Sequence, residues 1–455
     1  MSLRTWAGKA TSPSFFISLL TASLGKLCDS AAGKSTLNKI DAQSLVDASA
    51  LSKSAVAVVA RLRESDYSAF IVGGAVRDLL LGKRPKDFDV ATDATPEQVV
   101  ALFRGARIIG RRFQIVHVRM GREIIEVTTF RGHHDGDSSK IAAKSNKGLL
   151  LRDNVYGTLD QDAARRDLTI NALYLDPVNN LIYDDLNGLE DIQRRTIRII
   201  GDPATRYRED PVRMLRVARF AAKLGFNIDT PTQEAITECR HLLAEIPSAR
   251  LFDEAIKLFM SGHATTTFQQ LIRHDLLETL FPEAVNALHL TGSRELIYQA
   301  MKNTDGRIAR GKPVTPAFLF AAMLWPAVAL RSDEIVRAGN VEGSPVDAAG
   351  QQILSKSLER VSIPKRFSMP MREIWDLQPR LDKRSSKRAK SILALRRFRA
   401  AFDLLLLRAE HDSELNEVVK FWEEQQLLFP DIVGSQPAAE LPTKRRRPRR
   451  RKPAS

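Results

Sequence analysis

One stretch of the sequence, residues 71–95 (IVGGAVRDLLLGKRPKDFDVATDAT), limits what the rest of the chain can be. It places Gly73 and Gly74 between an apolar segment that predicts a strand and a segment that predicts a short helix. Glycines at a helix start favour phosphate binding, because backbone N–H groups point at the ligand and the helix dipole attracts its negative charge. We therefore expect a phosphate-binding turn at this point of the chain.

Two carboxylates, Asp87 and Asp89, follow this turn at a spacing of i, i+2. On a strand they would project to the same side, since side chains alternate between the two faces. Paired carboxylates beside a phosphate cradle predict a magnesium site for nucleotidyl transfer. A third carboxylate is expected on a neighbouring strand, and Glu126 within EIIEVTTFR is the best candidate. An ordinary ion pair between Glu126 and Arg131 is the alternative, because a buried carboxylate needs a cation.

The segment RRDLTIN supplies a second group of polar residues. In a helix, Asp167 and Asn171 would share a face at i, i+4, with Arg166 beside them. Arginine can grip a triphosphate, while Asp and Asn can bind a ribose hydroxyl. A polar helix face without a ligand remains open for this segment.

The segment RYREDPVRMLR supplies a third group. Asp210 before Pro211 has the pattern of a helix N-cap followed by proline at the first helical position. Arg213 and Arg216 at i, i+3 would point together toward a base edge or phosphates. An Asp acceptor beside an Arg donor is the minimum needed to read a Watson–Crick edge without a template.

Positive charge indicates a nucleic-acid partner. The formal charge is +15, and residues 444–452 (KRRRPRRRK) hold a dense basic run that reads as a disordered arm for a polyanion. Residues 383–399 form a second basic stretch, for which a solvated helix face is the alternative. The candidate RNA-contacting residues are Lys383, Arg384, Lys387, Arg388, Arg396, Arg397, Arg445, Arg446, Arg447, Arg449, Arg450 and Arg451.

Composition narrows the setting. Cys28 and Cys239 are the two cysteines, which make neither a disulfide framework nor a zinc site, so a reducing cytoplasm is expected. No apolar run approaches the ~18–20 residues that span a bilayer, so no membrane partner is expected. The first 28 residues lack Asp and Glu, which leaves organelle targeting open beside a plain leader.

The chain is expected to be an α+β protein: a catalytic head with a mixed sheet, followed by an all-helical neck and body and a disordered basic tail. The expected divisions are a leader over residues 1–50, a head over 51–201, a neck over 202–265, a body over 266–430 and a tail over 431–455.

Four blocks match a known group in order and spacing. They are GGAVRD with DFD, then RRDLTINAL, DDLNGLEDI and EDPVRMLR. With them the chain resembles the class II nucleotidyltransferases of the polymerase β superfamily, which include bacterial poly(A) polymerases and tRNA CCA-adding enzymes. Residues 108–118 (IIGRRFQIVHV), residues 247–259 and the arginine-rich C-terminus are similar to bacterial poly(A) polymerase I in particular.

The resemblance implies a role for each matching position. Asp87 and Asp89 would hold the metal and act in catalysis, with Asp167 and Glu126 as further catalytic carboxylates. The nucleotide-binding residues would be Gly73, Gly74, Arg77, Asp78, Arg166, Asn171, Asp210, Arg213 and Arg216. The implied cofactor is Mg²⁺, with Mn²⁺ as an alternative, and ATP is the implied substrate.

The activity implied is template-independent addition of AMP to RNA 3′ ends by a two-metal mechanism, in mRNA polyadenylation and RNA turnover. A monomer is expected, and association with RNA-degradation or RNA-chaperone proteins is left open. A CCA-adding enzyme is the first alternative. A catalytically silent RNA-binding protein is the alternative from another class, against which the intact carboxylates argue.

Overall fold

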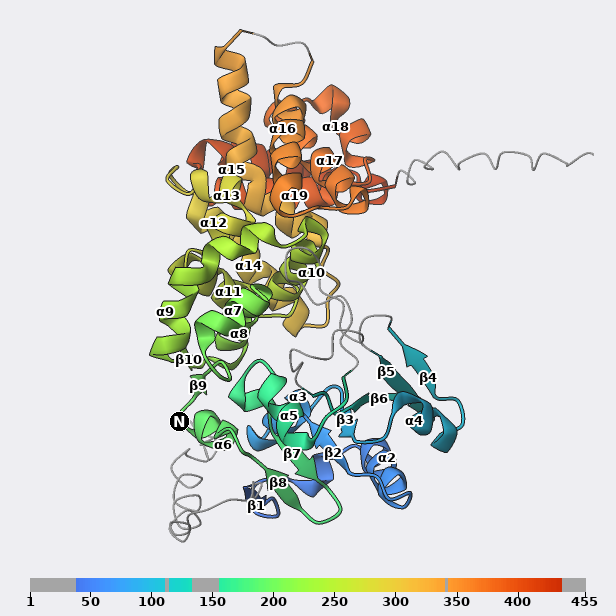
Figure 1. The fold of residues 1–455 in the computed structure, drawn as a ribbon. Helices are drawn as coiled ribbons and strands as arrows, with labels where there is room; N and C mark the ends of the chain where they lie inside the picture. Colours follow the sequence, from blue (N-terminus) through green and yellow to red (C-terminus); the bar gives the residue numbers. More distant parts are fainter. Residues whose placement is uncertain (1–37, 111–113, 133–154, 340–342, 436–455) are drawn as a thin grey trace, which may run out of the picture. The chain divides into compact units, whose positions relative to one another are not determined.

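The computed structural model describes residues 38–110, 114–132, 155–339 and 343–435. Its first half contains an eight-stranded sheet with the strand order β1-β8-β7-β2-β3-β6-β5-β4 (Figure 1). The strands are β1 Lys39–Asp41, β2 Ala69–Val72, β3 Asp89–Thr92, β4 Arg107–Ile109, β5 Ile115–Met120, β6 Glu123–Thr129, β7 Tyr174–Asp176 and β8 Leu181–Tyr183.

The sheet is mixed, as predicted. Strands β3 and β6 run parallel, and the other neighbours in this sheet run antiparallel within the described ranges. Asp89 is the Cα partner of Glu126 in the parallel pair. On its other side β3 pairs with β2, and Val72 at the end of β2 lies opposite Asp89. The register thus places the end of β2 beside two acidic residues, Asp89 on β3 and Glu126 on β6.

Five short helices accompany the sheet. Helix α2 begins after Ser52, whose side chain accepts from the N–H of Ala55, and α4 begins at a capping box of Thr95 and Gln98. Helix α2 packs on β2, β3 and β6, and α4 packs on β4, β5 and β6 (Figure 1). The five are α2 Lys53–Arg63, α3 Gly74–Leu80, α4 Pro96–Leu102, α5 Leu159–Arg165 and α6 Gly188–Gln193.

The sheet begins earlier in the sequence than predicted. Strand β1 pairs with β8 through Lys39–Asp41, so the prediction that residues 1–50 form a leader is wrong from Lys39 onward. A three-residue strand with a single partially buried side chain, Ile40, carries too weak a pattern to stand out in the sequence.

A small two-stranded sheet connects the head to the helices. Strand β9 (Thr196–Ile197) pairs in parallel with β10 (Asn227–Ile228). Beside it, Arg198 donates from Nε to Asp191 Oδ2 at 3.1 Å and from Nη1 to Asp229 Oδ2 at 2.9 Å. Arg198 therefore ties helix α6 of the head to the residue before helix α9.

Helices dominate after residue 202, as predicted, with β10 as the exception within the described part. Their bounds are α7 Pro203–Glu209, α8 Val212–Leu224, α9 Thr230–Cys239, α10 Ser248–Phe259, α11 Ala264–Arg273, α12 Leu276–Leu280, α13 Pro282–Asn286, α14 Ser293–Ala309, α15 Pro316–Arg337, α16 Pro345–Arg360, α17 Lys365–Asp382, α18 Ser386–Leu393, α19 Phe398–Ala409 and α20 Asn416–Leu428. Over the residues described, none of these helices is long and apolar enough to cross a membrane.

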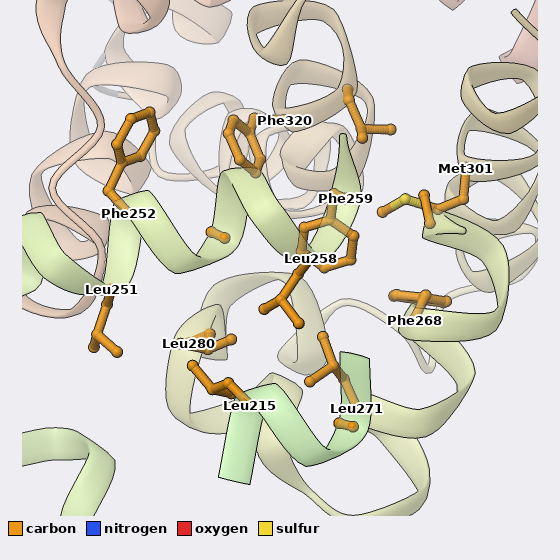
Figure 2. Packing of buried hydrophobic residues seen from close by; sticks show 14 of the residues in the cluster. Leu215, Leu251, Phe252, Leu258, Phe259, Phe268, Leu271, Leu280, Met301 and Phe320 are labelled. Carbon is orange, nitrogen blue, oxygen red and sulfur yellow. The ribbon is translucent and has the colours of Figure 1, made fainter. Parts of the chain in front are cut away.

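The helices share a core of large apolar side chains (Figure 2). Phe252 and Phe259 of α10 are buried in it, and the rings of Phe252 and Phe320 are 6.1 Å apart. Leu215 of α8 is fully buried in the same cluster. Because α8 is fixed on its apolar face by this packing, its opposite face is held in place for contacts with the head.

Candidate active site

Most of the predicted site residues meet at one cavity of about 600 Å³, lined by residues of the head and of helix α8. Two predicted residues, Asp87 and Asp78, do not line it. The predicted residues that do are Gly73, Gly74, Arg77, Asp89, Glu126, Arg166, Asp167, Asn171, Asp210, Arg213 and Arg216.

The glycine turn is set by backbone conformation. Gly73 has φ +71°, ψ −128°, where a side chain is strained, and it precedes the first residue of α3. A Cβ at Gly73 would lie 3.3 Å from Nη1 of Arg166. The N–H of Gly73 donates to the carbonyl of Leu173 at 3.3 Å. Gly73 therefore contributes the turn and not its own N–H group. The first N–H groups of α3 lack intrahelical partners and suit an anion.

Asp89 and Glu126 form the acidic end of the cavity. They are opposite each other on β3 and β6, and both open to the cavity. Desolvation of the Asp89 carboxylate raises its pKa to about 6, and the like charges of Glu126 and Asp87 add to this shift. The positive charge of Arg166 opposes it. The two negative carboxylates repel each other, and a cation bound between them would reduce this repulsion.

Asp87 lies before β3 and is exposed. The prediction that Asp87 and Asp89 share one strand face is wrong, because β2 ends opposite Asp89 and Asp87 has no strand partner. Its charge still reaches Asp89, since it contributes to the raised pKa.

Glu126 is less buried than expected. Its side chain is 48% exposed, and its Oε1 lies 3.3 Å from Nε2 of His117 on β5. The predicted alternative partner, Arg131, lines the same cavity.

The carboxylates fit a magnesium ion that is completed by substrate. No group of three or more His, Cys, Asp or Glu in the described ranges is arranged to hold a metal alone. Magnesium commonly uses one or two protein carboxylates and takes its other ligands from phosphates and water. Asp89 and Glu126 supply such a pair of hard oxygen donors.

Arg166 is held rigidly at the cavity wall. It donates from Nε to Tyr174 Oη at 2.9 Å and from Nη2 to Asp162 Oδ2 at 3.0 Å, and its guanidinium lies over the Tyr174 ring. Burial alone would lower the pKa of Arg166, but Tyr174 and Asp162 outweigh it and raise that pKa. Asp162 was missed in the sequence, although its i, i+4 spacing to Arg166 was a usable signal.

Asp167 and Asn171 come together without sharing a helix. Helix α5 ends at Arg165, and Leu168 is extended. Asp167 and Asn171 therefore do not lie on one helix. Asn171 Nδ2 still lies 3.5 Å from Asp167 Oδ1, and Asn171 Oδ1 accepts from Nη1 of Arg77 at 2.6 Å. Burial would raise the pKa of Asp167, yet Arg216 holds it below the ordinary value.

Asp78 supports the site from outside the cavity. Its Oδ1 accepts from Nε and Nη2 of Arg77, at 2.9 and 2.7 Å. It therefore positions Arg77, whose Nη1 reaches Asn171.

Helix α8 lines the cavity through Arg213, Arg216, Arg219, Phe220 and Lys223. Spacings of three and four residues place these side chains on one face. Arg213 donates from Nη1 to Glu209 Oε2 and to the carbonyl of Arg206, both at 2.8 Å. The last three of the five were missed in the sequence, although the same helical spacing continues through them.

Asp210 lies at the junction of α7 and α8. It ends α7, and Pro211 takes the N-cap position of α8, so the predicted N-cap is one residue off. Its Oδ1 nevertheless accepts from the N–H of Val212 at 3.3 Å. Its Oδ2 accepts from Nη2 of Arg250 on α10 at 2.7 Å. Arg250, distant in sequence, carried no signal that linked it to this site.

The basic stretch of residues 383–399 begins directly after α17, contains α18 and reaches the start of α19. Lys383, Arg384, Lys387, Arg388 and Arg396 are exposed. Arg397 is less exposed and donates to Glu373 Oε2 at 2.9 Å. The six predicted tail residues, Arg445, Arg446, Arg447, Arg449, Arg450 and Arg451, lie outside the described residues, as do Cys28 and the first 37 residues.

A mixed sheet that presents paired carboxylates beside a glycine turn, facing a cationic helix, defines a nucleotidyltransferase. Three family models match the chain: "Poly A polymerase head domain" over residues 69–198, "Probable RNA and SrmB- binding site of polymerase A" over residues 225–288, and "Polymerase A arginine-rich C-terminus" over residues 339–454.

Poly(A) polymerase I of Salmonella typhimurium is 44% identical over 416 residues, 89% of this chain and 90% of that protein. Poly(A) polymerase I of Escherichia coli O6:H1 is 46% identical over 410 residues, 88% of each chain. The chain therefore belongs to the poly(A) polymerase I family.

CCA-adding enzymes are more distant relatives. That of Bacillus pumilus is 38% identical over 226 residues, which is 50% of this chain and 54% of the relative. The fold is similar to the CCA-adding enzyme of Bacillus stearothermophilus solved in complex with CTP, with a TM-score of 0.57, 24% identity and 83% of each chain covered.

Proposed function

We propose that the chain adds AMP residues from ATP to RNA 3′ ends without a template and releases pyrophosphate. The observation that carries the proposal is one cavity in which Asp89 and Glu126 face the cations of α8. A nucleoside triphosphate suits both ends of this cavity, because its phosphates attract cations and share a metal with carboxylates.

Asp89 and Glu126 would hold Mg²⁺, with the nearby charge of Asp87 adding to the attraction. Mn²⁺ prefers the same oxygen ligands. When bound, the metal would assist the attacking 3′ hydroxyl and offset the charge of the leaving phosphates.

The sugar and phosphates would be positioned by groups that are already fixed. Arg166 is immobilised by Asp162 and Tyr174, and Asn171 is held between Arg77 and Asp167. Such preorganised donors lose little freedom when the substrate binds, so their binding energy is retained.

Asp210 and Arg213 would read the base. Adenine offers an amino donor beside a ring-nitrogen acceptor, which an Asp acceptor and an Arg donor match, whereas guanine and uracil offer the reverse order. Cytosine shares adenine's order, so this pair of readers selects ATP and CTP over GTP and UTP. Asp210 forms an ion pair with Arg250, and Arg213 forms one with Glu209. These contacts restrict the side chains of Asp210 and Arg213 before a base binds.

The similarity along the chain supports poly(A) addition over CCA addition. The relatives called poly(A) polymerase I match over about 88–89% of the chain, and the CCA-adding relative matches over 50%. The likeness to a CCA-adding fold keeps CCA addition as the second candidate.

A primer-extension gel tests the proposal. The full chain with Mg²⁺ and a labelled generic RNA receives ATP, CTP or both, with a tRNA lacking its end in parallel and Asp89→Ala as the inactive control. A long ladder with ATP alone on either RNA is the expected result. Addition that needs CTP, is confined to tRNA and stops within three nucleotides would establish CCA addition instead, and no extension would favour a silent RNA-binding protein.

A further inference from the structure

Helix α8 presents two further cations to the cavity, Arg219 and Lys223. Neither forms an ion pair within the described ranges of the chain, and Nε of Arg219 is buried without a hydrogen-bond partner. A buried donor left unpaired costs free energy that a bound ligand can recover.

Two carboxylates, Glu254 and Asp167, act electrostatically on Arg219, and each already accepts a hydrogen bond from another cation. Glu254 accepts from Nζ of Lys257 at 2.8 Å, and Asp167 accepts from Nε of Arg216 at 2.7 Å. Both of these carboxylates therefore already have a cationic partner.

A third cation lies beside this pair. The guanidinium groups of Arg77 and Arg219 both lie over the ring of Phe220, with their centres 5.1 and 4.6 Å from it. The ring face attracts both cations and partly offsets their mutual repulsion. Burial, followed by the charge of Arg216, lowers the pKa of Arg219. Burial also lowers the pKa of Lys223; the charge of Asp78 opposes this shift, and the charges of Arg77 and Arg219 add to it.

The cationic group adjoins the glycine turn. A Cβ at Gly74 would lie 3.5 Å from Nη2 of Arg77, so Arg77 connects the first turn of α3 to Phe220 and Arg219. Gly74, Arg77, Arg219 and Lys223 all line the same cavity.

We propose that Arg219 and Lys223 bind the β- and γ-phosphates of the incoming nucleoside triphosphate and the pyrophosphate that it becomes. The proposal rests on the proposed function. Two cations one helical turn apart suit a ligand that concentrates charge on two adjacent phosphorus atoms. An RNA backbone carries a single charge per nucleotide and matches them less well.

Pyrophosphate binding to the full chain tests this assignment without reference to which nucleotide is added. Inorganic pyrophosphate is titrated calorimetrically into the wild type, Arg219→Gln, Lys223→Gln and the matched control Lys302→Gln, an exposed cation on α14. Each substitution in the pair should weaken pyrophosphate binding and raise the KM for the nucleotide about tenfold, which corresponds to the loss of one charge-assisted hydrogen bond. The control should match the wild type.

Two further readouts separate binding from structural support. The melting temperature without ligand should stay equal or rise in Arg219→Gln, because a like-charge contact is removed, and Arg219→Lys should recover part of the pyrophosphate affinity. Affinity for a labelled RNA should remain unchanged.

Unchanged pyrophosphate binding in both variants would overturn the assignment, and so would a loss of RNA affinity in its place. If the wild type extends RNA with a nucleotide other than ATP, the proposed function fails, but the pyrophosphate titration still decides the role of Arg219 and Lys223.

Discussion

Arg216 on helix α8 donates from Nε to Oδ2 of Asp167 at 2.7 Å, and its Nη2 lies 2.6 Å from the same oxygen. The contact joins the helical half of the chain to the segment that follows α5. Because Asp167 also lies beside Asn171, it links the α8 cations to the nucleotide-contacting residues of the head.

Removing this ion pair should destabilise the fold and misplace the site. Arg216→Gln is expected to lower the free energy of unfolding by about 1.5–3 kcal/mol, because a charged acceptor loses its donor. Urea unfolding of Arg216→Gln, Asp167→Asn and the double variant gives the coupling energy, which should exceed about 0.5 kcal/mol. Additive effects of the two substitutions would show that the pair contributes nothing specific.

The acidic pair should be needed for nucleotide addition and dispensable for RNA binding. Asp89→Ala and Glu126→Gln are each expected to slow extension by at least about 100-fold, because the loss of a preorganised charge at the reacting phosphate has such an effect. Filter binding to a labelled RNA should change little. The exposed Glu64→Gln on the far end of α2 is the control, since its side chain contacts Arg61 alone among the described pairs. Normal extension by either site variant would contradict the role given to these carboxylates.

Gly73→Ala should cost both stability and activity. At φ +71°, ψ −128° a residue with a Cβ is strained by about 1–3 kcal/mol, and this Cβ would lie 3.3 Å from Nη1 of Arg166. Gly82→Ala is the matched control, because Gly82 has φ +67° and open space around it. Both variants should lose stability in thermal unfolding, Gly73→Ala at least as much as Gly82→Ala, while extension falls in Gly73→Ala alone. Equal extension activity in the two variants would show that the Gly73 turn has no role in the active site.

Stability should depend on pH through His274, which is buried at the end of α11. Burial, and then the charge of Arg273, lowers its pKa from 6.5. The folded state therefore binds fewer protons than the unfolded state below that pH, so the stability that His274 contributes is lost as the pH falls.

We expect the stability of wild type relative to His274→Asn to decline between about pH 7.5 and about pH 5.5. Chemical unfolding with EDTA present measures this difference. Asp89 has the opposite sign, since its raised pKa favours the folded state as the pH falls, but it is common to both proteins and cancels. A constant difference over this range would contradict the prediction.

The basic residues of α18 should determine part of the salt dependence of RNA binding. Lys387 and Arg388 are exposed and have no ion-pair partner among the residues described. The double variant Lys387→Gln, Arg388→Gln should bind single-stranded RNA more weakly and reduce the slope of log K against log salt by about 0.7 per lost contact. Arg397→Gln should have less effect, because Glu373 already neutralises Arg397. An unchanged slope in the double variant would place the RNA elsewhere.

The sequence was sufficient for the local features of the site. The double glycine, the acidic strand residues and the arginines of α8 each carry a signal within a few residues, and the structure brings them to one cavity. The halves of the chain were also predictable, because the strand and helix periodicities change after residue 200.

Pairings across long separations were not predictable. Arg250 reaches Asp210 from 40 residues away, and His117 on β5 lies beside Glu126 on β6. Asp87 fell outside β3 because the length of β2 sets where pairing ends, which is a property of two strands and not of one segment.

The cavity draws its lining from Val72 to Lys223, and this order has a consequence for synthesis on the ribosome. Asp89 meets Glu126 only after β6 has been made, and the cations of α8 arrive about 90 residues later still. A nascent chain that ends within the head has its acidic pair and Arg166 but lacks the α8 cations. The α8 side of the cavity is thus completed only when the first helices that follow the head have emerged.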